Sequence, residues 1–138
     1  MDNGADATAG VLMNQPARLD PDYADFIRDS FERQGAIETI GARLVELAPG
    51  ICRISLPVTD KVTQNHGYVH AGILGMIAAA AGSYAAMTLY PPGREVLTIE
   101  YRSNFLAPAT GIEMVASARV LRSGRNISVA QVEIFSIN

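Results

Sequence analysis

The sequence predicts an α+β domain in which one antiparallel sheet wraps around one long central helix. Residues 71–89 carry no charge and are small or apolar on every face, as a helix enclosed by other elements requires. Alternating apolar runs at 42–57, 95–106, 112–121 and 127–137 predict antiparallel strands. A helix, two strands, a buried helix and three further strands form an order that is typical of α+β domains.

The first helix is predicted to begin at Asp20 and Pro21. A carboxylate there accepts hydrogen bonds from free backbone N–H groups, and proline fits the first helical turn. Phe26 and Ile27 continue an amphipathic pattern, and Gly35 is expected to end the helix.

Turn residues predict the boundaries of the other elements. The tripeptide APG at 48–50 divides the first alternating run into two strands joined by a tight turn. Gly67 suits a strained turn in the loop before the central helix, and YPPG at 90–93 ends that helix because proline cannot continue it. APATG and RSGRN separate the last three strands.

Size and apolar content predict one domain that associates with a second copy. The 138 residues suffice for a single core, expected at 19–138 after a flexible N-terminal tail at 1–18 that lacks the features of a signal peptide. A hydrophobic fraction of 49% with only 18% charged residues is high for so short a chain. We therefore expect part of the apolar surface to meet another subunit.

Charge and cysteine content argue against several classes of protein. A net charge of -3, with only the spaced Arg119, Arg122 and Arg125 as a basic group, disfavours nucleic-acid and membrane partners. The uncharged helix is too rich in small residues for a strong membrane-spanning signal. The single Cys52 excludes an intramolecular disulfide, favours a cytoplasmic location and, without a base nearby, indicates core packing.

Several ordered motifs resemble those of one family. HAG at the start of the central helix, then PPG, VLTIEYRSNFLAPATG and RVLRSGR, resemble the hotdog-fold acyl-CoA thioesterases of the phenylacetic-acid-degradation type, over residues 40–137. The resemblance implies a homodimer with one continuous sheet, often paired into a homotetramer, with active sites at the dimer interface. It also implies coenzyme A thioesters as substrates, and neither a metal nor another cofactor. The acyl group is left open between an aryl and a medium aliphatic chain.

The resemblance places catalytic groups at the start of the central helix. Ala71 occupies the position whose backbone N–H stabilises the oxyanion, and a helix N-terminus favours negative charge there. His70 is expected to orient this turn or bond near the thioester, and Gln64 to position the carbonyl or the water. Both side chains could instead only stabilise the loop. Asn65 and Gly72 are expected to contact the substrate.

A metal site is disfavoured in the same segment. His66 and His70 form an H-x-x-x-H pair, but no third ligand is evident nearby and Gly67 interrupts a helix between them.

The catalytic acid of the family is missing from this sequence. An Asp or Glu is implied nine residues after the histidine, and Ala79 stands there. IAAAAGSYAA reads like IADAAGSYAA with one change. Either the chain is a natural relative that does not hydrolyse thioesters, or the acid was deliberately replaced, which the otherwise intact motif favours. We expect an inactive or weakly active acyl-CoA thioesterase; the alternative is a non-catalytic acyl-CoA binding protein. A hydratase would need an acid–histidine pair that the sequence does not show.

Three other side chains are weaker candidates on the helix and the strand after it. Ser83 follows Ala79 by one helical turn and can bond substrate or water, and Thr98 falls where the strand faces the site. Structural roles are equally compatible with both. Glu100 is the nearest substitute acid, although a solvated strand carboxylate is the simpler interpretation.

A basic turn is the candidate site for the phosphates of coenzyme A. It combines two cations with several backbone donors, and a plain solvated hairpin is the alternative. Its residues are Arg122, Ser123, Gly124 and Arg125.

Overall fold

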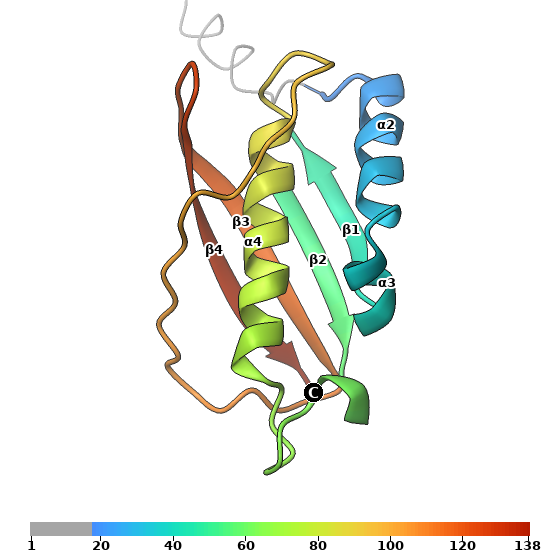
Figure 1. Ribbon diagram of the computed structural model, residues 1–138, viewed down its shortest axis with the longest axis vertical. Coiled ribbons are helices and arrows are strands. Elements are labelled where there is room, and N and C mark those ends of the chain that lie inside the picture. Colours follow the sequence, from blue (N-terminus) through green and yellow to red (C-terminus); the bar gives the residue numbers. More distant parts are fainter. Residues whose placement is uncertain (1–17) are drawn as a thin grey trace, which may run out of the picture.

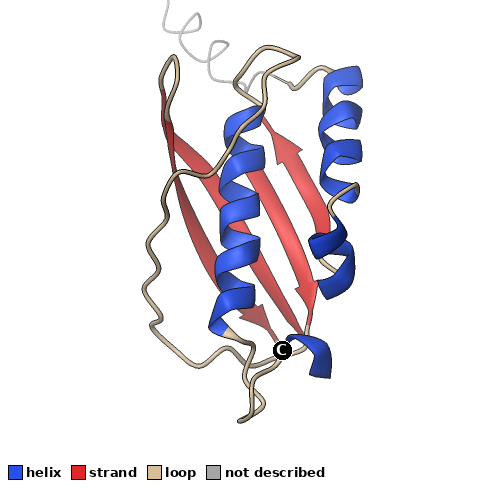
Figure 2. Ribbon diagram, viewed as in Figure 1, coloured by secondary structure: helices blue, strands red, loops and turns tan. Residues whose placement is uncertain are grey.

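The computed structural model describes residues 18–138, so the predicted tail at 1–18 lies outside the described residues except for Arg18. One antiparallel sheet has the strand order β1-β2-β3-β4, and a long helix, α4, packs on one of its faces (Figures 1 and 2). This confirms the predicted α+β architecture. In chain order the elements are α2 (Pro21–Glu32), α3 (Gly35–Ile40), β1 (Arg43–Ala48), β2 (Ile51–Pro57), the 3-10 helix η1 (Asp60–Val62), α4 (Ala71–Met87), β3 (Glu113–Ser123) and β4 (Ser128–Ile137).

The central helix α4 is buried against β2, β3 and β4, as its uncharged sequence predicts. Small side chains allow the sheet to come close, since a Cβ added at Gly82 would lie only 3.6 Å from the Cβ of Ala130. Apolar residues of α4 and of the inner sheet face form the core between them. They include Leu74, Ile77, Ala81, Ala85, Cys52, Ile54, Leu56, Met114, Ala116 and Ala118.

The helix α2 begins as predicted but does not end as predicted. The Asp20 carboxylate accepts from the Tyr23 N–H at 3.0 Å, which caps the first turn. The helix ends at Glu32, and Gly35 starts the short helix α3 instead of terminating α2. The reason is conformational: Gly41, with φ of 74°, is the residue that takes the left-handed conformation after a helix, and Gly35 does not.

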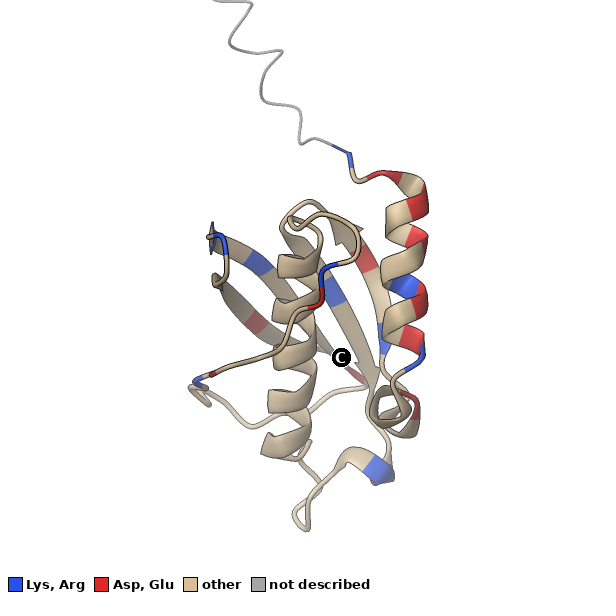
Figure 3. Cartoon of the chain, turned by 45° about the horizontal axis from the view of Figure 1, so that its top comes forward, with Lys and Arg blue, Asp and Glu red and all other residues tan. Residues whose placement is uncertain are grey.

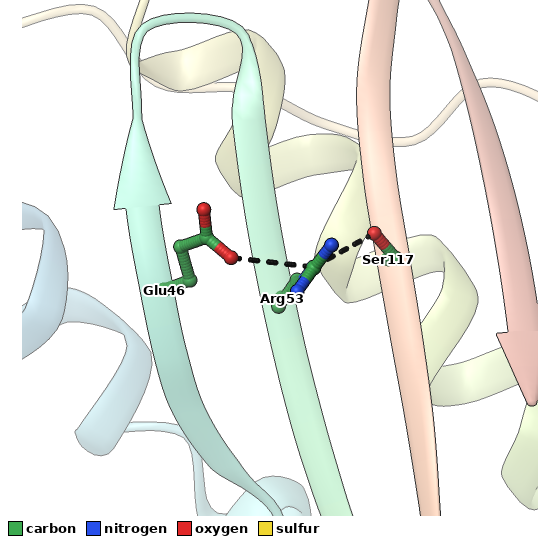
Figure 4. Close-up of polar contacts among 3 residues, drawn as sticks. All are labelled: Glu46, Arg53 and Ser117. Carbon is green, nitrogen blue, oxygen red and sulfur yellow. Dashed lines mark hydrogen bonds and ion pairs between the residues drawn. The ribbon is translucent and has the colours of Figure 1, made fainter. Parts of the chain in front are cut away.

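Polar side chains lie at the centre of the outer face of the sheet, among exposed apolar ones such as Ile51 and Phe135. The Arg53 side chain donates from Nε to Ser117 Oγ at 3.1 Å and pairs with Glu46 Oε2 at 3.2 Å, which links three neighbouring strands (Figure 4). Arg53 alternates with the buried Cys52 and Ile54 of the same strand, so it faces away from α4. The edge strand β1 also has a bulge, where the register with β2 shifts between Leu44 and Glu46.

The strand predicted at 95–106 is wrong for the single chain. These residues, called the 95–106 segment below, are extended but belong to no ladder within residues 18–138. The apolar side chains that give the alternation are exposed: Leu97 at 85%, Ile99 at 80% and Phe105 at 61%. A strand exists only where a neighbour accepts its backbone hydrogen bonds, and here none does. The two later strands are confirmed, as β3 and β4.

Charged residues lie on the periphery of the fold. Helix α2 carries several acidic residues, whereas α4 carries none (Figure 3). No helix within residues 18–138 has both the length and the apolar character needed to cross a bilayer.

Candidate active site

The start of α4 presents one free backbone donor. His70 is the N-cap residue, and its Nδ1 accepts from the Gly72 N–H at 2.9 Å, so the ring proton is placed on Nε2. The Ala71 N–H bonds no acceptor within residues 18–138. Ala71 is therefore available as the predicted oxyanion donor, whereas the amide of Gly72 is occupied by His70 and is not free for a substrate.

The loop before α4 is held partly by its own side chains. The Gln64 carbonyl Oε1 accepts from the His66 backbone N–H, and the Asn65 amide lies 3.2 Å from His66 Nε2. Gly67, with φ of 85°, makes the strained turn that the sequence predicts. These side-chain contacts are solvent-exposed, so Gln64 and Asn65 stabilise the loop and can still exchange partners with a ligand.

A second group of predicted residues lies around a cavity of about 470 Å³ between α2, α4 and the 95–106 segment. Ala79, Ser83 and Thr98 all line it, and the two hydroxyls lie 3.0 Å apart. The structure thus brings together three side chains that were singled out separately. The volume of this cavity falls in the range of small-molecule sites.

Sequence reasoning missed the polar wall that α2 and the residues just after it contribute to this cavity. Gln34 Nε2 donates to the Tyr84 hydroxyl at 3.0 Å, and Ser30 Oγ lies 3.2 Å from the same hydroxyl. Phe26, Ser30 and Gln34 are spaced by four residues, which places them on one side of this part of the chain. That spacing was the available signal, but it does not say which neighbour the side chains face.

The helix start and Ala79 do not meet within one chain. They are eight residues apart on α4, which corresponds to about 12 Å along the helix axis. Ala71 and Ala79 therefore cannot both contact one thioester group from the same subunit.

The basic turn joins β3 and β4 at the opposite end of the molecule from the start of α4, beside the C-terminal end of that helix (Figure 1). Arg122, Gly124 and Arg125 line a hollow of about 390 Å³ in the β3–β4 hairpin, and both guanidinium groups are exposed. The Tyr90 hydroxyl donates to Gly124 O at 3.0 Å and so ties the hairpin to the turn after α4. Ser123 Oγ is 3.4 Å from Ser128 Oγ, outside this hollow.

A family model described as the thioesterase superfamily matches residues 66–138, which is more than half of the chain. The chain belongs to the thioesterase superfamily. A 1,4-dihydroxy-2-naphthoyl-CoA hydrolase from Listeria monocytogenes is 32% identical over 100 residues, which cover 72% of this chain and 81% of that relative. The crystal structure of a thioesterase family protein from Silicibacter pomeroyi has a TM-score of 0.80 at 39% identity, and covers 83% of this chain and 84% of that one. These matches confirm the hotdog fold.

A thioesterase enzyme from Staphylococcus aureus is a further structural relative. It was solved with one glutamine replaced by alanine, and has a TM-score of 0.72 at 26% identity, covering 75% of this chain and 87% of that one. A second solved variant of the same protein replaces a glutamate by alanine, fifteen residues further along. Gln64 and Ala79 are also fifteen residues apart.

Two further candidates from the sequence are the substitute acid Glu100 and the histidine pair His66 and His70. Glu100 pairs with Arg102 at 3.4 Å, is 71% exposed and does not line the cavity, which favours a solvated carboxylate on the 95–106 segment. Within residues 18–138, no three His, Cys, Asp or Glu side chains gather as metal ligands, so the His66 and His70 pair has no third partner there.

Cys52 of this thioesterase chain is a core residue, as predicted. It is completely buried, and burial raises the pKa of its thiol to about 12. A raised pKa disfavours the thiolate, which is the nucleophilic form.

We expect Cys52 in the folded chain to resist iodoacetamide at pH 8. With a pKa near 12 about one thiol in 10,000 is ionised at that pH, against roughly a quarter for an ordinary cysteine. Mass spectrometry of the reaction over time measures the modified fraction. The same reaction in guanidinium chloride is the control and should go to completion. Modification of the folded chain at the unfolded rate would contradict the burial of this side chain.

Proposed function

We propose that this chain binds coenzyme A thioesters of aryl or medium-chain acids and hydrolyses them poorly or not at all. The observation that carries the proposal is the place of Ala79. It lines the cavity beside Ser83 and Thr98, where the resemblance implies a carboxylate. A methyl group there can neither activate water nor attack a thioester.

The proposed chemistry begins at the start of α4. The free Ala71 N–H and the positive end of the helix stabilise negative charge on the thioester oxygen. The His70 ring holds the turn through Nδ1 and offers its Nε2–H to solvent or ligand. Gln64 orients the carbonyl or the attacking water. An acid at position 79 supplies the missing step, which is activation of that water.

The spacing in the Staphylococcus aureus relative supports these roles for Gln64 and Ala79. In that enzyme the altered glutamine and the altered glutamate are fifteen residues apart, which is the spacing between Gln64 and Ala79 in this chain. If the two pairs correspond, Ala79 stands in place of a carboxylate. The phenylacetic-acid-degradation type rests on the sequence motifs and stays a prediction.

A second subunit is part of the proposal. Ala71 and Ala79 are about 12 Å apart along α4. One thioester can therefore lie near both positions only if Ala71 comes from one chain and Ala79 from the other. The exposed apolar side chains of the 95–106 segment provide a surface for a second copy, and β4 provides an edge strand. We propose a homodimer joined there, and a homotetramer as its further assembly, in the cytoplasm.

The alternative function is a non-catalytic acyl-CoA binding protein on the same fold. Ala79 itself favours it, because binding needs the cavity and the donors but no base. Two observations distinguish the proposals. One is whether the natural gene encodes alanine at position 79, which would favour the binding protein. The other is the rate of thioester hydrolysis, described in the Discussion.

Calorimetric titration with a non-hydrolysable analogue of phenylacetyl-CoA tests the binding proposal. We expect the chain to bind the analogue, and Arg125→Ala to bind about 3- to 10-fold more weakly, since one exposed contact to phosphate is lost. Added salt should weaken binding to the parent chain more than to the variant.

Arg119→Ala is the matched control because it removes the same charge from the outer face of the sheet, where Arg119 bonds Gln131 at 2.6 Å. Its affinity should equal that of the parent chain. Equal losses in both variants would mean that the hairpin does not bind the phosphates.

A further inference from the structure

The turn that follows α4 places a third arginine beside the basic hairpin. Arg94 donates from Nη1 to the Arg125 backbone oxygen at 3.1 Å, and its guanidinium carbon lies 5.8 Å from the centre of the Tyr90 ring. The Tyr90 hydroxyl in turn donates to Gly124 O at 3.0 Å. Both side chains therefore cross from the turn after α4 to the β3–β4 hairpin, and all of these contacts form inside one chain.

No carboxylate pairs with the arginines gathered at this hairpin. The ion pairs within residues 18–138 join β1 to β2 or lie inside the 95–106 segment, so none of them involves Arg94, Arg122 or Arg125. Three cations thus lie together in a chain whose net charge is -3. Cations that share a surface without a counter-charge repel one another, and a bound anion relieves that repulsion.

The tip of the hairpin adds backbone donors to these cations. The N–H groups of Arg125, Asn126 and Ile127 bond no acceptor within residues 18–138. All three residues line the hollow of about 390 Å³. Free N–H groups in succession, surrounded by guanidinium groups, suit the binding of phosphate.

The guanidinium of Arg94 keeps its bidentate edge free. Nη1 bonds the Arg125 oxygen, whereas Nε and Nη2 form no bond within residues 18–138. Two parallel N–H groups of this kind match two oxygens of one phosphate, and such charge-assisted pairs are stronger than bonds to neutral acceptors. Arg94 can therefore bind a phosphate without giving up its bond to the hairpin.

The hairpin also lies at a suitable distance from the proposed thioester position. Met87 ends α4 eight residues after Ala79, about 12 Å further along the axis. The hairpin lies beside that end of the helix (Figure 1). In coenzyme A a long pantetheine arm separates the thioester from the phosphates of the ADP part. A thioester near Ala79 can therefore have its phosphates at the hairpin.

We propose that Arg94 binds a phosphate of the ADP part of coenzyme A, as a third cation beside Arg122 and Arg125. The inference rests on the proposed function. It adds to the ligand site a residue from the turn after α4, which the sequence motifs do not single out.

Calorimetric titration with the non-hydrolysable analogue of phenylacetyl-CoA tests this role. Arg94→Ala should bind the analogue about 3- to 10-fold more weakly than the parent chain, since one bidentate contact to phosphate is lost. Added salt should weaken binding to the variant less than binding to the parent, because one fewer charge takes part. Arg119→Ala is again the matched control, and its affinity should equal that of the parent.

Arg94→Gln separates a phosphate contact from mere support of the hairpin. Its side-chain amide can still donate to the Arg125 oxygen, but it carries no charge. We expect this variant to lose as much affinity as Arg94→Ala does. If Arg94 only held the hairpin in place, the glutamine variant would bind like the parent.

Parent affinity in either Arg94→Ala or Arg94→Gln would overturn this inference and leave the proposed function standing. A parent chain that does not bind the analogue would overturn the proposed function, and this inference with it.

Discussion

Ala79→Asp should raise the rate of thioester hydrolysis by about 100- to 10,000-fold, because a positioned general base contributes that much to many enzymes. The new carboxylate would project into the cavity beside Ser83 and Thr98, where their hydroxyls can hold it or the water that it activates. Steady-state release of free thiol from phenylacetyl-CoA, benzoyl-CoA and hexanoyl-CoA measures the rate, and the ranking of these substrates separates aryl from aliphatic preference.

Two variants isolate the cause of the gain. Ala79→Asn has almost the same shape without the charge, and Ala80→Asp puts the same carboxylate on the neighbouring residue of the cavity wall. Neither should be activated. The aspartate at 79 should also lower the unfolding midpoint slightly, since a half-buried carboxylate replaces a methyl group. Equal turnover by the parent chain and Ala79→Asp would show that position 79 is not catalytic, and Glu100 or direct attack by water would then be tested.

Ile99→Asp should convert the protein from a homo-oligomer to a monomer at micromolar concentration. The Ile99 side chain is 80% exposed in one chain, so its replacement costs the monomer little. If the 95–106 segment pairs with its copy, each dimer loses two buried isoleucines and gains two buried charges, which weakens association by about 100-fold or more. Light scattering measures the mass, against 14.7 kDa for one chain.

Val45→Asp is the matched control for this prediction. Val45 is exposed as well, but it lies on β1 at the opposite edge of the sheet, so the mass should stay that of the parent. A parent chain that is already monomeric would contradict the proposed dimer, and equal dissociation of both variants would place the interface elsewhere.

Much of the fold follows from local patterns. The uncharged run from Ala71 onward predicts a buried helix, and the alternation in β2, β3 and β4 predicts strands with one buried face. Both patterns depend only on which side chains are apolar, so they can be read from the sequence. The 95–106 segment alternates in the same way, but alternation records only that a stretch suits a sheet. Whether the segment forms a strand depends on a neighbouring strand that accepts its backbone hydrogen bonds, and the pattern within the segment does not identify that neighbour.

The same division applies to the candidate site. His70, Ala71 and Gln64 are close in sequence, so their spacing predicts a common turn at the start of α4. The contact of Gln34 with Tyr84 and that of Thr98 with Ser83 join residues that are far apart along the chain. Such contacts are set by how α2 and the 95–106 segment pack on α4, and no spacing rule contains that information.

The bulge in β1 bears on how large an assembly can become. A register shift between Leu44 and Glu46 interrupts the regular row of backbone donors and acceptors that another chain would need at that edge. The sheet then offers only the edge at β4 for extension, and a contact of that edge with its own copy is symmetric. In the proposed dimer that contact uses the regular edge of both sheets, so we expect growth by strand pairing to stop at two chains.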